Sequence, residues 1–270
     1  MSEKLVLKVL VDNTTYIDEY LLGEPALCFY IEEGGQKILF DTGYSDVLIK
    51  NAQTLNVDLA QISTIVLSHG HNDHTQGIKY LREYFDLSEV NVVAHPDALK
   101  NKFFEGESIG SPFLKEELET FCKVTLSAKP INITENLIFL GEIPESVTSR
   151  TAIGLMQEGN CLQADHVMDD SALVYQNTEG LFIITGCSHS GICNIIEYAK
   201  RLCCETRILG VIGGFHLFKT DVVLGQTIAY FKQNNIQHLY PCHCVSFPAK
   251  AEIHKQIPIR DVWSGMTLEV

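Results

Sequence analysis

Hydrophobic and polar residues follow one another in short runs along this chain, separated by turn residues. Several early runs have the two-residue period or the continuous apolar character of strands. Gly34 and Gly35 lie between two of them and predict a hairpin, because glycine tolerates the backbone angles of tight turns. In the first half, the predicted strands are residues 5–11, 26–32, 36–40, 64–67 and 91–94.

Segments with a helical spacing of apolar residues follow these strands, and the alternation repeats in the second half. The predicted helices are residues 45–55, 75–84, 194–203, 222–232 and 248–255. The predicted strands of the second half are residues 137–140, 172–176, 181–185, 208–212, 238–240 and 257–262. This pattern favours an α/β fold with sheets inside and helices outside. No linker rich in Pro, Gly or Ser divides the chain, so we expect one domain over residues 1–270, built from two similar halves.

Two polar stretches, residues 97–120 and 142–165, lack this regular alternation. We expect them to be insertions that wall a cleft and select the substrate. Their apolar side chains could cover a ring system of a substrate or simply pack beneath the insertion. These side chains are Phe103, Phe104, Phe113 and Met156.

Charge and cysteine content narrow the class of protein. The net charge of −14 argues against a nucleic-acid backbone as partner. No apolar run reaches the roughly 20 residues that span a bilayer, and the charged N-terminus has no signal-peptide pattern. An odd number of cysteines without such a signal indicates reduced thiols. We therefore expect a cytoplasmic protein that binds neither nucleic acid nor a membrane, with a homodimer left open. The positive charge of bound metal ions could still attract a small anionic substrate.

Metal-binding residues concentrate directly after the apolar run 64–67. His69, His71, Asp73 and His74 place four possible ligands within six residues. Neutral imidazole and carboxylate bind zinc, iron or manganese. His69 and His71 can share one ion, whereas the adjacent Asp73 and His74 can turn toward a second. The sequence therefore predicts two divalent metal ions, with zinc first and iron or manganese as alternatives.

Several motifs resemble a known family. SHGHNDH at 68–74 resembles the signature of the metallo-β-lactamase superfamily, and LFDTG at 39–43 matches its first motif. Other segments resemble its dihydropteroate-synthase-like branch, which is similar to archaeal dihydropterin-ribofuranosylaminobenzene-phosphate synthases. These are GEIP at 141–144, DDSAL at 169–173, TGCSHSG at 185–191, GGFHL at 213–217 and PCHC at 241–244. The resemblance implies a four-layer αββα sandwich with two metals at one sheet edge.

The resemblance also implies the remaining ligands: His189 for the first ion and His243 for the second. Cys187 stands where the superfamily usually has a bridging aspartate, so we expect no carboxylate bridge there and a larger role for a bridging water or hydroxide. This departure argues against simple β-lactamase activity. Cys242 and Cys244 flank His243, and each is either a metal contact or a small buried residue.

Three further residues are candidates around the centre. His216 follows two glycines, and substrate contact, proton transfer, metal binding and core packing all stay open for it. Asp41 is expected to accept an imidazole N–H and fix the tautomer of a ligand, or else to cap the turn at Gly43. His166 lies where the superfamily has a third-motif histidine, which makes it a reserve ligand.

These residues predict a metal-dependent hydrolase that activates water toward a phosphoester, ester or lactone, with Asp73 and His216 in catalysis. The alternative is a synthase that joins a pterin methyl pyrophosphate to an arylamine. A redox function is a further hypothesis. It is disfavoured because di-iron relatives of the superfamily carry an acidic residue where this chain has Gly70. The last hypothesis is a metal-binding protein without catalytic activity.

Overall fold

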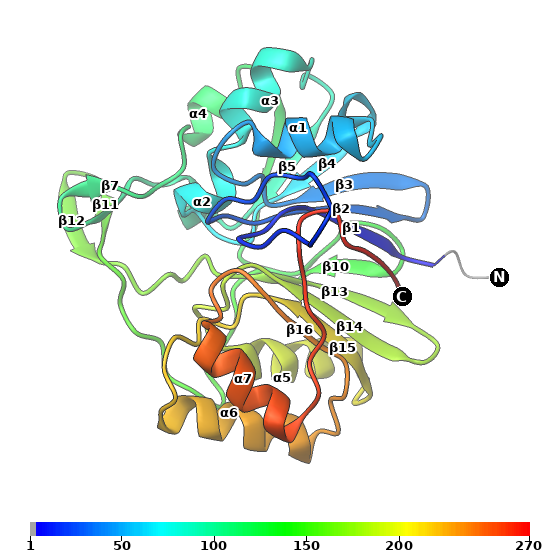
Figure 1. The fold of residues 1–270 in the computed structure, drawn as a ribbon. Coiled ribbons are helices and arrows are strands. Elements are labelled where there is room, and N and C mark those ends of the chain that lie inside the picture. The colour runs from blue at the N-terminus through cyan, green and yellow to red at the C-terminus, as the bar shows by residue number, and fades with distance from the viewer. Residues whose placement is uncertain (1–3) are drawn as a thin grey trace.

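Two β-sheets lie face to face in the middle of the molecule, with helices on both outer sides (Figure 1). The computed structural model describes residues 4–270. The first sheet has the order β17-β1-β2-β3-β4-β5-β8, with strands β1 (Val6–Val11), β2 (Cys28–Glu33), β3 (Gln36–Phe40), β4 (Thr64–Val66), β5 (Asn91–Ala94), β8 (Lys123–Leu126) and β17 (Thr267–Glu269). The second has the order β16-β15-β14-β13-β10-β9, with strands β9 (Ile131–Asn132), β10 (Leu137–Phe139), β13 (Ala172–Asn177), β14 (Gly180–Thr185), β15 (Ile208–Gly213) and β16 (Leu239–Pro241).

The core between the sheets follows from the alternation of side chains along each strand. In β2, Phe29 and Ile31 face the second sheet and join the central apolar cluster. Cys28 and Tyr30 point the other way, into the cluster beneath the first helical layer. The predicted hairpin at Gly34 and Gly35 joins β2 and β3, and both glycines have positive φ angles.

Each outer face of the double sheet is covered by a layer of helices (Figure 1). The first layer contains α1 (Val47–Thr54), α2 (Asn72–Thr75), α3 (Ile78–Tyr84) and α4 (Lys115–Leu118), with short 3₁₀ turns at Leu59–Gln61 and Pro96–Leu99. The second contains α5 (Ile192–Cys203), α6 (Val222–Gln233) and α7 (Phe247–Gln256). The predicted αββα order of layers is confirmed.

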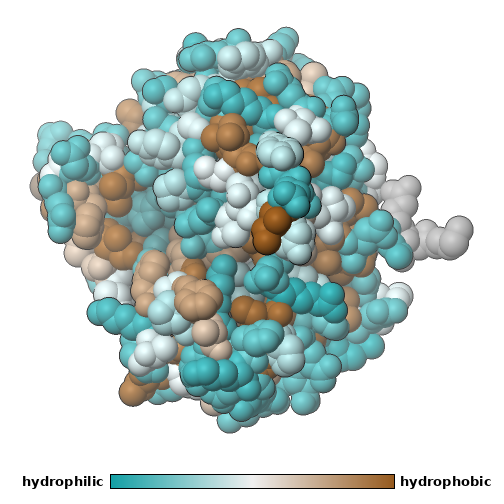
Figure 2. All heavy atoms as spheres, in the orientation of Figure 1, coloured by the Kyte–Doolittle hydropathy of each residue, from teal (hydrophilic) through white to brown (hydrophobic). Residues whose placement is uncertain are grey.

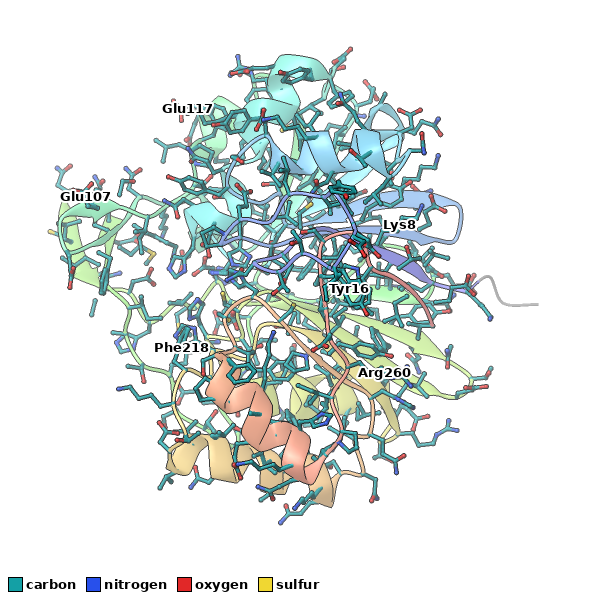
Figure 3. All side chains as sticks on the ribbon, in the orientation of Figure 1. Lys8, Tyr16, Glu107, Glu117, Phe218 and Arg260 are labelled. Atoms are coloured by element: carbon teal, nitrogen blue, oxygen red, sulfur yellow. The ribbon has the colours of Figure 1, made fainter. Side chains whose placement is uncertain are left out.

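A small third sheet forms a lobe that projects from the body (Figure 1). Its order is β12-β11-β6-β7, with strands β6 (Lys102–Phe104), β7 (Glu107–Ser108), β11 (Leu155–Glu158) and β12 (Cys161–Ala164). The segments 97–120 and 142–165 meet in this lobe, because Leu155 of β11 pairs with Phe103 of β6. Glu107 marks its outer end (Figure 3).

Two expectations about elements were wrong in detail. The helix expected over residues 75–84 is divided into α2 and α3 around Gly77. Residues 257–262 make only an isolated bridge, between Ile259 and Leu239, so no strand forms there. The chain instead ends with β17, which pairs with β1. Within residues 4–270, none of the helices is long and apolar enough to span a membrane.

Candidate metal centre

The candidate site lies where loops from both sheets meet at one edge of the sandwich. Strands β3, β4 and β5 are parallel, as are β14, β15 and β16, so within each of these groups the carboxyl ends face the same edge. Polar side chains follow directly on the buried ends of these strands. They are Asp41 after β3, His69 and His71 after β4, Cys187 and His189 after β14, His216 after β15, and His243 after β16.

His69, His71 and His189 form the first group of possible ligands, with one ring nitrogen of each lying within 4.8 Å of the others. His69 Nε2 and His71 Nδ1 are 3.0 Å apart. Among residues 4–270, both ring nitrogens of His189 and Nε2 of His71 are buried without a hydrogen-bond partner. Buried polar atoms are rarely left unpaired in proteins. These free nitrogens therefore fit a bound cation.

The second group consists of Asp73, His74, Cys187 and His243, again within 4.8 Å. Nε2 of His74 lies 3.2 Å from His243 Nε2 and 3.2 Å from Cys187 Sγ. An Asp73 oxygen lies 3.3 Å from His243 Nε2. One carboxylate, two imidazoles and one thiol converge on a single point, and this donor set suits zinc and its neighbours among the transition metals.

Asp41 is buried between the two groups and orients ligands of both. One of its oxygens lies 2.6 Å from His74 Nδ1 and accepts a hydrogen bond of 2.7 Å from Ser68 Oγ. Ser68 Oγ in turn lies 2.9 Å from His69 Nδ1. If both Nδ1 atoms carry the proton, each Nε2 is free to face the centre. Ser68 belongs to the SHGHNDH motif, but the sequence does not indicate its part in this chain of contacts.

The first group is held in the neutral form that binds metal. Burial lowers the pKa of His69 and His189 well below the ordinary value, and the other imidazoles nearby act in the same direction. Burial also lowers the pKa of His71 to about 4, against the opposite influence of Asp169 and Asp73. Neutral imidazoles can donate lone pairs without first losing a proton.

The second group behaves differently because it contains a carboxylate. Burial favours neutral His74, yet Asp73 and Asp41 together raise the pKa of His74 well above its usual value. Burial likewise opposes ionisation of Asp73, but His74 and His243 lower the pKa of this carboxyl well below its usual value. The carboxylates of Asp73 and Asp41 thus favour positive charge at the position of this group.

A buried ion pair ties the projecting lobe to the loop that carries the histidines. Lys102 of β6 lies 2.6 Å from Asp165 and 2.9 Å from Asp169. The second oxygen of Asp169 accepts a hydrogen bond of 2.7 Å from the backbone N–H of Gly70. Burial disfavours the charge on Asp169, but Lys102 outweighs it and lowers the pKa of the carboxyl. Sequence reasoning gave Lys102 no role, since a lone lysine in a polar stretch carries no signal.

His189 and His243 are held by acceptors far from them in sequence. Asp170 accepts hydrogen bonds from the backbone N–H groups of His189 and Ser190, at 3.0 and 2.9 Å. Asp12 accepts one from the His243 N–H at 3.0 Å, and Asn13 Oδ1 lies 3.1 Å from His243 Nδ1. The contribution of the N-terminal loop was missed entirely.

Members of both groups line a cleft of about 400 Å³: His71 and His189 from the first, and Asp73, Cys187 and His243 from the second. Its walls include Phe104 from the lobe, Ile153 and Phe218, so apolar surface surrounds the polar floor. Phe218 lies at the mouth between the two halves, and apolar residues gather around it (Figures 2 and 3). A second hollow of about 720 Å³ adjoins the cleft and shares Ile153, His189 and His216 with it.

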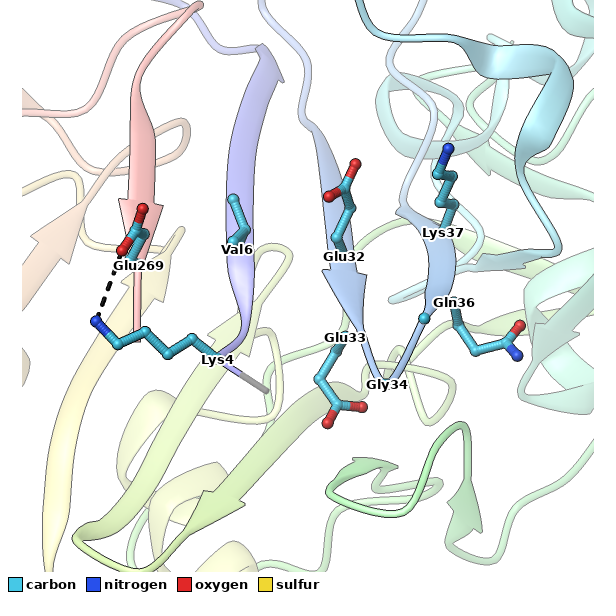
Figure 4. Close-up of a pocket in the computed structure, with 9 residues that line it drawn as sticks. Lys4, Val6, Glu32, Glu33, Gly34, Gln36, Lys37 and Glu269 are labelled. Carbon is cyan, nitrogen blue, oxygen red and sulfur yellow. Dashed lines mark ion pairs between the residues drawn. The ribbon is translucent and has the colours of Figure 1, made fainter. Parts of the chain in front are cut away.

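Another hollow lies at the opposite end of β3, beside the β2–β3 turn (Figure 4). It has a volume of about 510 Å³ and is lined by Glu32, Glu33, Lys37 and other residues, with an ion pair between Lys4 and Glu269. None of the histidines or cysteines of the candidate groups contributes to it. The possible metal ligands are therefore concentrated at the opposite edge of the sandwich, where the candidate centre lies.

Not every candidate joins the centre. His166 is exposed after β12 and belongs to none of the clusters of possible ligands within residues 4–270. Cys242 points into the apolar core between the sheets, whereas Cys244 lines the cleft. Phe104 also reaches the cleft, but Phe113 packs on Phe121 under the first helical layer, and Met156 is buried.

Comparisons with known proteins show the family of the chain. The sequence profile of the metallo-β-lactamase superfamily matches residues 21–149. An uncharacterized protein of Methanocaldococcus jannaschii is 34% identical, over 92% of this chain and 93% of its own. The 7,8-dihydropterin-6-methyl-4-(β-D-ribofuranosyl)-aminobenzene-5′-phosphate synthase of the same organism is 31% identical, over 82% and 80%. The crystal structure of Tm1679, described as a metal-dependent hydrolase of the β-lactamase superfamily, superposes with a TM-score of 0.86 at 30% identity, covering 98% and 99%.

Proposed function

Because the chain belongs to the metallo-β-lactamase superfamily, we propose that it is a metal-dependent hydrolase whose two-ion centre activates water toward a phosphoester, ester or lactone. The observation that carries this proposal is the meeting of two groups of possible ligands on the floor of one cleft. Ring nitrogens of His71 and His189 that are buried without partners support a bound cation. We propose zinc as the ion, since imidazole, carboxylate and thiol together suit it.

Two divalent ions in such a site lower the pKa of a shared water and polarise the oxygen that the water attacks. His69, His71 and His189 would hold one ion, and Asp73, His74 and His243 the other, with Asp41 fixing ring orientation. Cys187 brings a thiol, in place of a bridging carboxylate, to the edge of the second group.

His216 is available to deliver a proton to the leaving group. Its ring lies 4.4 Å from the ring of His189, measured between centroids, and it lines both adjoining hollows. A group at this position touches a substrate that enters from either hollow. In hydrolysis, water adds to the reacting carbonyl or phosphoryl group, and the departing oxygen takes the proton.

A synthase is the second candidate, favoured by the 31% identity to the archaeal synthase. In that reaction an arylamine nitrogen bonds to a methylene carbon of a pterin, pyrophosphate leaves with the bonding electrons, and the amine loses a proton. The apolar walls formed by Phe104, Ile153 and Phe218 could accept flat rings. The same ligand groups would serve either reaction, so the walls of the cleft decide the substrate.

The test is a substrate screen with protein reconstituted with zinc, iron or manganese. The substrates are phosphodiesters, lactones, esters and a pterin methyl pyrophosphate, the last with and without an arylamine. We expect turnover of a simple diester, ester or lactone without amine. Pyrophosphate release only when the arylamine is present would favour the synthase instead.

His71→Ala removes a proposed ligand of the first ion. This variant should lose at least one metal equivalent and lower turnover by a factor of at least about 100. His238→Ala, an exposed histidine outside the centre, is the matched control and should keep metal and rate. Metal content and rate that stay unchanged in His71→Ala would contradict the proposal.

A further inference from the structure

Beyond the two ligand groups, three side chains meet in a further cluster, and two of them, His216 and Cys244, hold neither ion of the proposed two-ion centre. Cys187, His216 and Cys244 each place one sulfur or ring nitrogen within 4.8 Å of the other two. They come from the loops after β14, β15 and β16, and all three line the cleft of the candidate centre. Cys244 reaches the cleft although Cys242, two residues earlier, packs in the apolar core.

The backbone around the cluster is shaped to bring the two thiols together. β15 lies between β14 and β16, so the cysteines can approach only by crossing the end of β15. Gly214 makes room for this, because a Cβ atom there would lie 2.4 Å from Cys244 Sγ and 3.3 Å from the Cα of Cys187. His216 follows with a φ of 51°, in the left-handed region that a non-glycine residue rarely adopts. Strained or crowded positions of this kind are often kept for function.

Hydrogen bonds further orient the sulfur of Cys244. The backbone N–H of His216 donates to Cys244 Sγ at 3.3 Å, and the thiol donates to the carbonyl of Cys187 at 3.5 Å. An N–H donor aimed at a sulfur stabilises the thiolate form that binds metal. Nδ1 of His216 is buried and finds no hydrogen-bond partner among residues 4–270.

We propose that Cys187, His216 and Cys244 form a third metal site, for a thiophilic divalent ion such as Zn²⁺ or Cd²⁺, beside the two-ion centre. A tetrahedral zinc ion with Zn–S of about 2.3 Å and Zn–N of about 2.0 Å separates its ligand atoms by about 3.5 to 3.8 Å. The ligand atoms of the cluster lie no more than 4.8 Å apart. To hold a zinc ion, they need to approach one another by about 1 Å. Side-chain rotation supplies such a shift.

The proposed site has consequences for charge and for the neighbouring centre. Binding exchanges the two thiol protons, which pass to solvent, for one divalent ion, so the two thiolates balance the charge of the ion. Cys187 also belongs to the group of Asp73, His74 and His243, and its thiolate can therefore bridge the third ion to the second. An ion held by these three residues in tetrahedral geometry would keep its fourth position for a water or another ligand. Occupation of the site withdraws the His216 imidazole from proton transfer.

The experiment is a titration of chelator-treated, reduced full-length protein with Cd²⁺, followed by thiolate-to-metal absorption and by ¹¹³Cd NMR. The wild type should bind three ions per chain, one of them with the resonance of a site with two sulfurs. Cys244→Ser and His216→Ala should each bind two ions, and Cys244→Ser should lose the two-sulfur resonance. Cys204→Ser, which alters an exposed cysteine far from the cleft, should behave like the wild type.

Circular dichroism of each variant shows whether the fold persists, and the two single variants test the same site independently. Two ions in the wild type, with absorption unchanged in Cys244→Ser, would overturn the proposal. So would absorption that is lost in Cys187→Ser but kept in Cys244→Ser, since Cys187 would then be only a ligand of the second ion. These readouts need no substrate, so they stand whether or not the chain is a hydrolase.

Discussion

At the residue scale, several residues that surround the candidate centre adopt unusual backbone conformations at the strand ends. Asp41, Ser188, His216 and His243 all have φ angles between 50 and 60°, although none is glycine. Side chains in ordinary extended geometry would alternate away from the edge. The left-handed turns change the chain direction at these points, and two of the four side chains, His216 and His243, line the cleft. The surrounding hydrogen bonds offset the cost of about 1–3 kcal/mol at each position.

Gly70 gives a direct test of how tightly the histidine loop is packed. A Cβ atom at this position would lie 2.2 Å from the carbonyl oxygen of Ala98. Gly70→Ala should therefore displace the loop, lower the free energy of unfolding by about 1–3 kcal/mol and weaken metal binding. Urea unfolding and metal analysis measure both effects.

Gly225→Ala is the matched control for that substitution. Gly225 lies in α6 with nothing within 4 Å of an added Cβ. Because glycine is unfavourable inside a helix, alanine should stabilise the protein by about 0.5–1 kcal/mol and leave metal content unchanged. Equal effects of the two substitutions would contradict the packing argument.

The opposite pKa shifts of the two groups predict the order in which metals leave on acidification. Because the pKa of His71 is lowered to about 4, its ring stays neutral until the pH approaches that value. The pKa of His74 is raised, so protons compete for it at higher pH. In His243→Ala, which keeps the first group intact, the first ion should stay bound to a lower pH. In His71→Ala, which keeps the second group intact, the second ion should leave at a higher pH. Dialysis at stepped pH with metal analysis decides the order, and the reverse order would refute this assignment.

The sequence revealed residues whose partners are local and missed those whose partners are distant. His69, His71, Asp73 and His74 were found from their spacing alone. His189 and His243 needed the family resemblance. Asn13 could not be found, because its contact with His243 joins positions 230 residues apart and a lone asparagine after a strand has no chemical signature. For Cys244, a metal contact and a small buried residue both stayed open, and the structure places its side chain in the wall of the cleft.

At the element scale, the predicted strands are mostly present because each carries enough apolar residues to bury one or both faces. The prediction errors arise where apolar residues are buried by packing against helices and not by pairing between strands. Ile257 is buried against the second helical layer and Ile259 packs partly on it, which explains the apolar spacing without a strand. Residues 75–84 are interrupted at Gly77, where a Cβ atom would lie 1.9 Å from the carbonyl oxygen of Thr42. Close approach of this kind between two segments leaves no periodic trace in the sequence.

The link between the lobe and the histidine loop can be tested through Lys102. Its side chain is fully buried with two carboxylates. Lys102→Met leaves those charges unpaired and should lower the free energy of unfolding by about 3–5 kcal/mol. It should also loosen the Gly70 contact and lower metal affinity, which isothermal titration of the apo-protein measures.

Lys100→Met is the control for this variant. Lys100 pairs with Asp97 and Glu158, but its side chain is 32% exposed. Because solvent-exposed ion pairs contribute about 0–1 kcal/mol, this substitution should change stability little. A similar loss in both variants would show that burial of the Lys102 ion pair has no special importance.

At the scale of the whole molecule, the centre exists only because the two halves pack against each other. His69, His71, Asp73 and His74 come from the first half, and Cys187, His189 and His243 from the second. The central apolar cluster, with Phe29, Phe40 and Phe139 among its members, fixes their relative position. The layered architecture was predictable from the alternation of elements, but the ligand separations depend on side-chain packing across this core.

Anomalous X-ray diffraction from crystals of the protein loaded with two equivalents of zinc tests the central claim most directly. Two peaks are predicted in the cleft, one contacting His69, His71 and His189, and the other Asp73, His74 and His243. An absence of peaks between these side chains, or ions bound elsewhere while the histidines stay unoccupied, would contradict the two-ion centre and the function proposed from it.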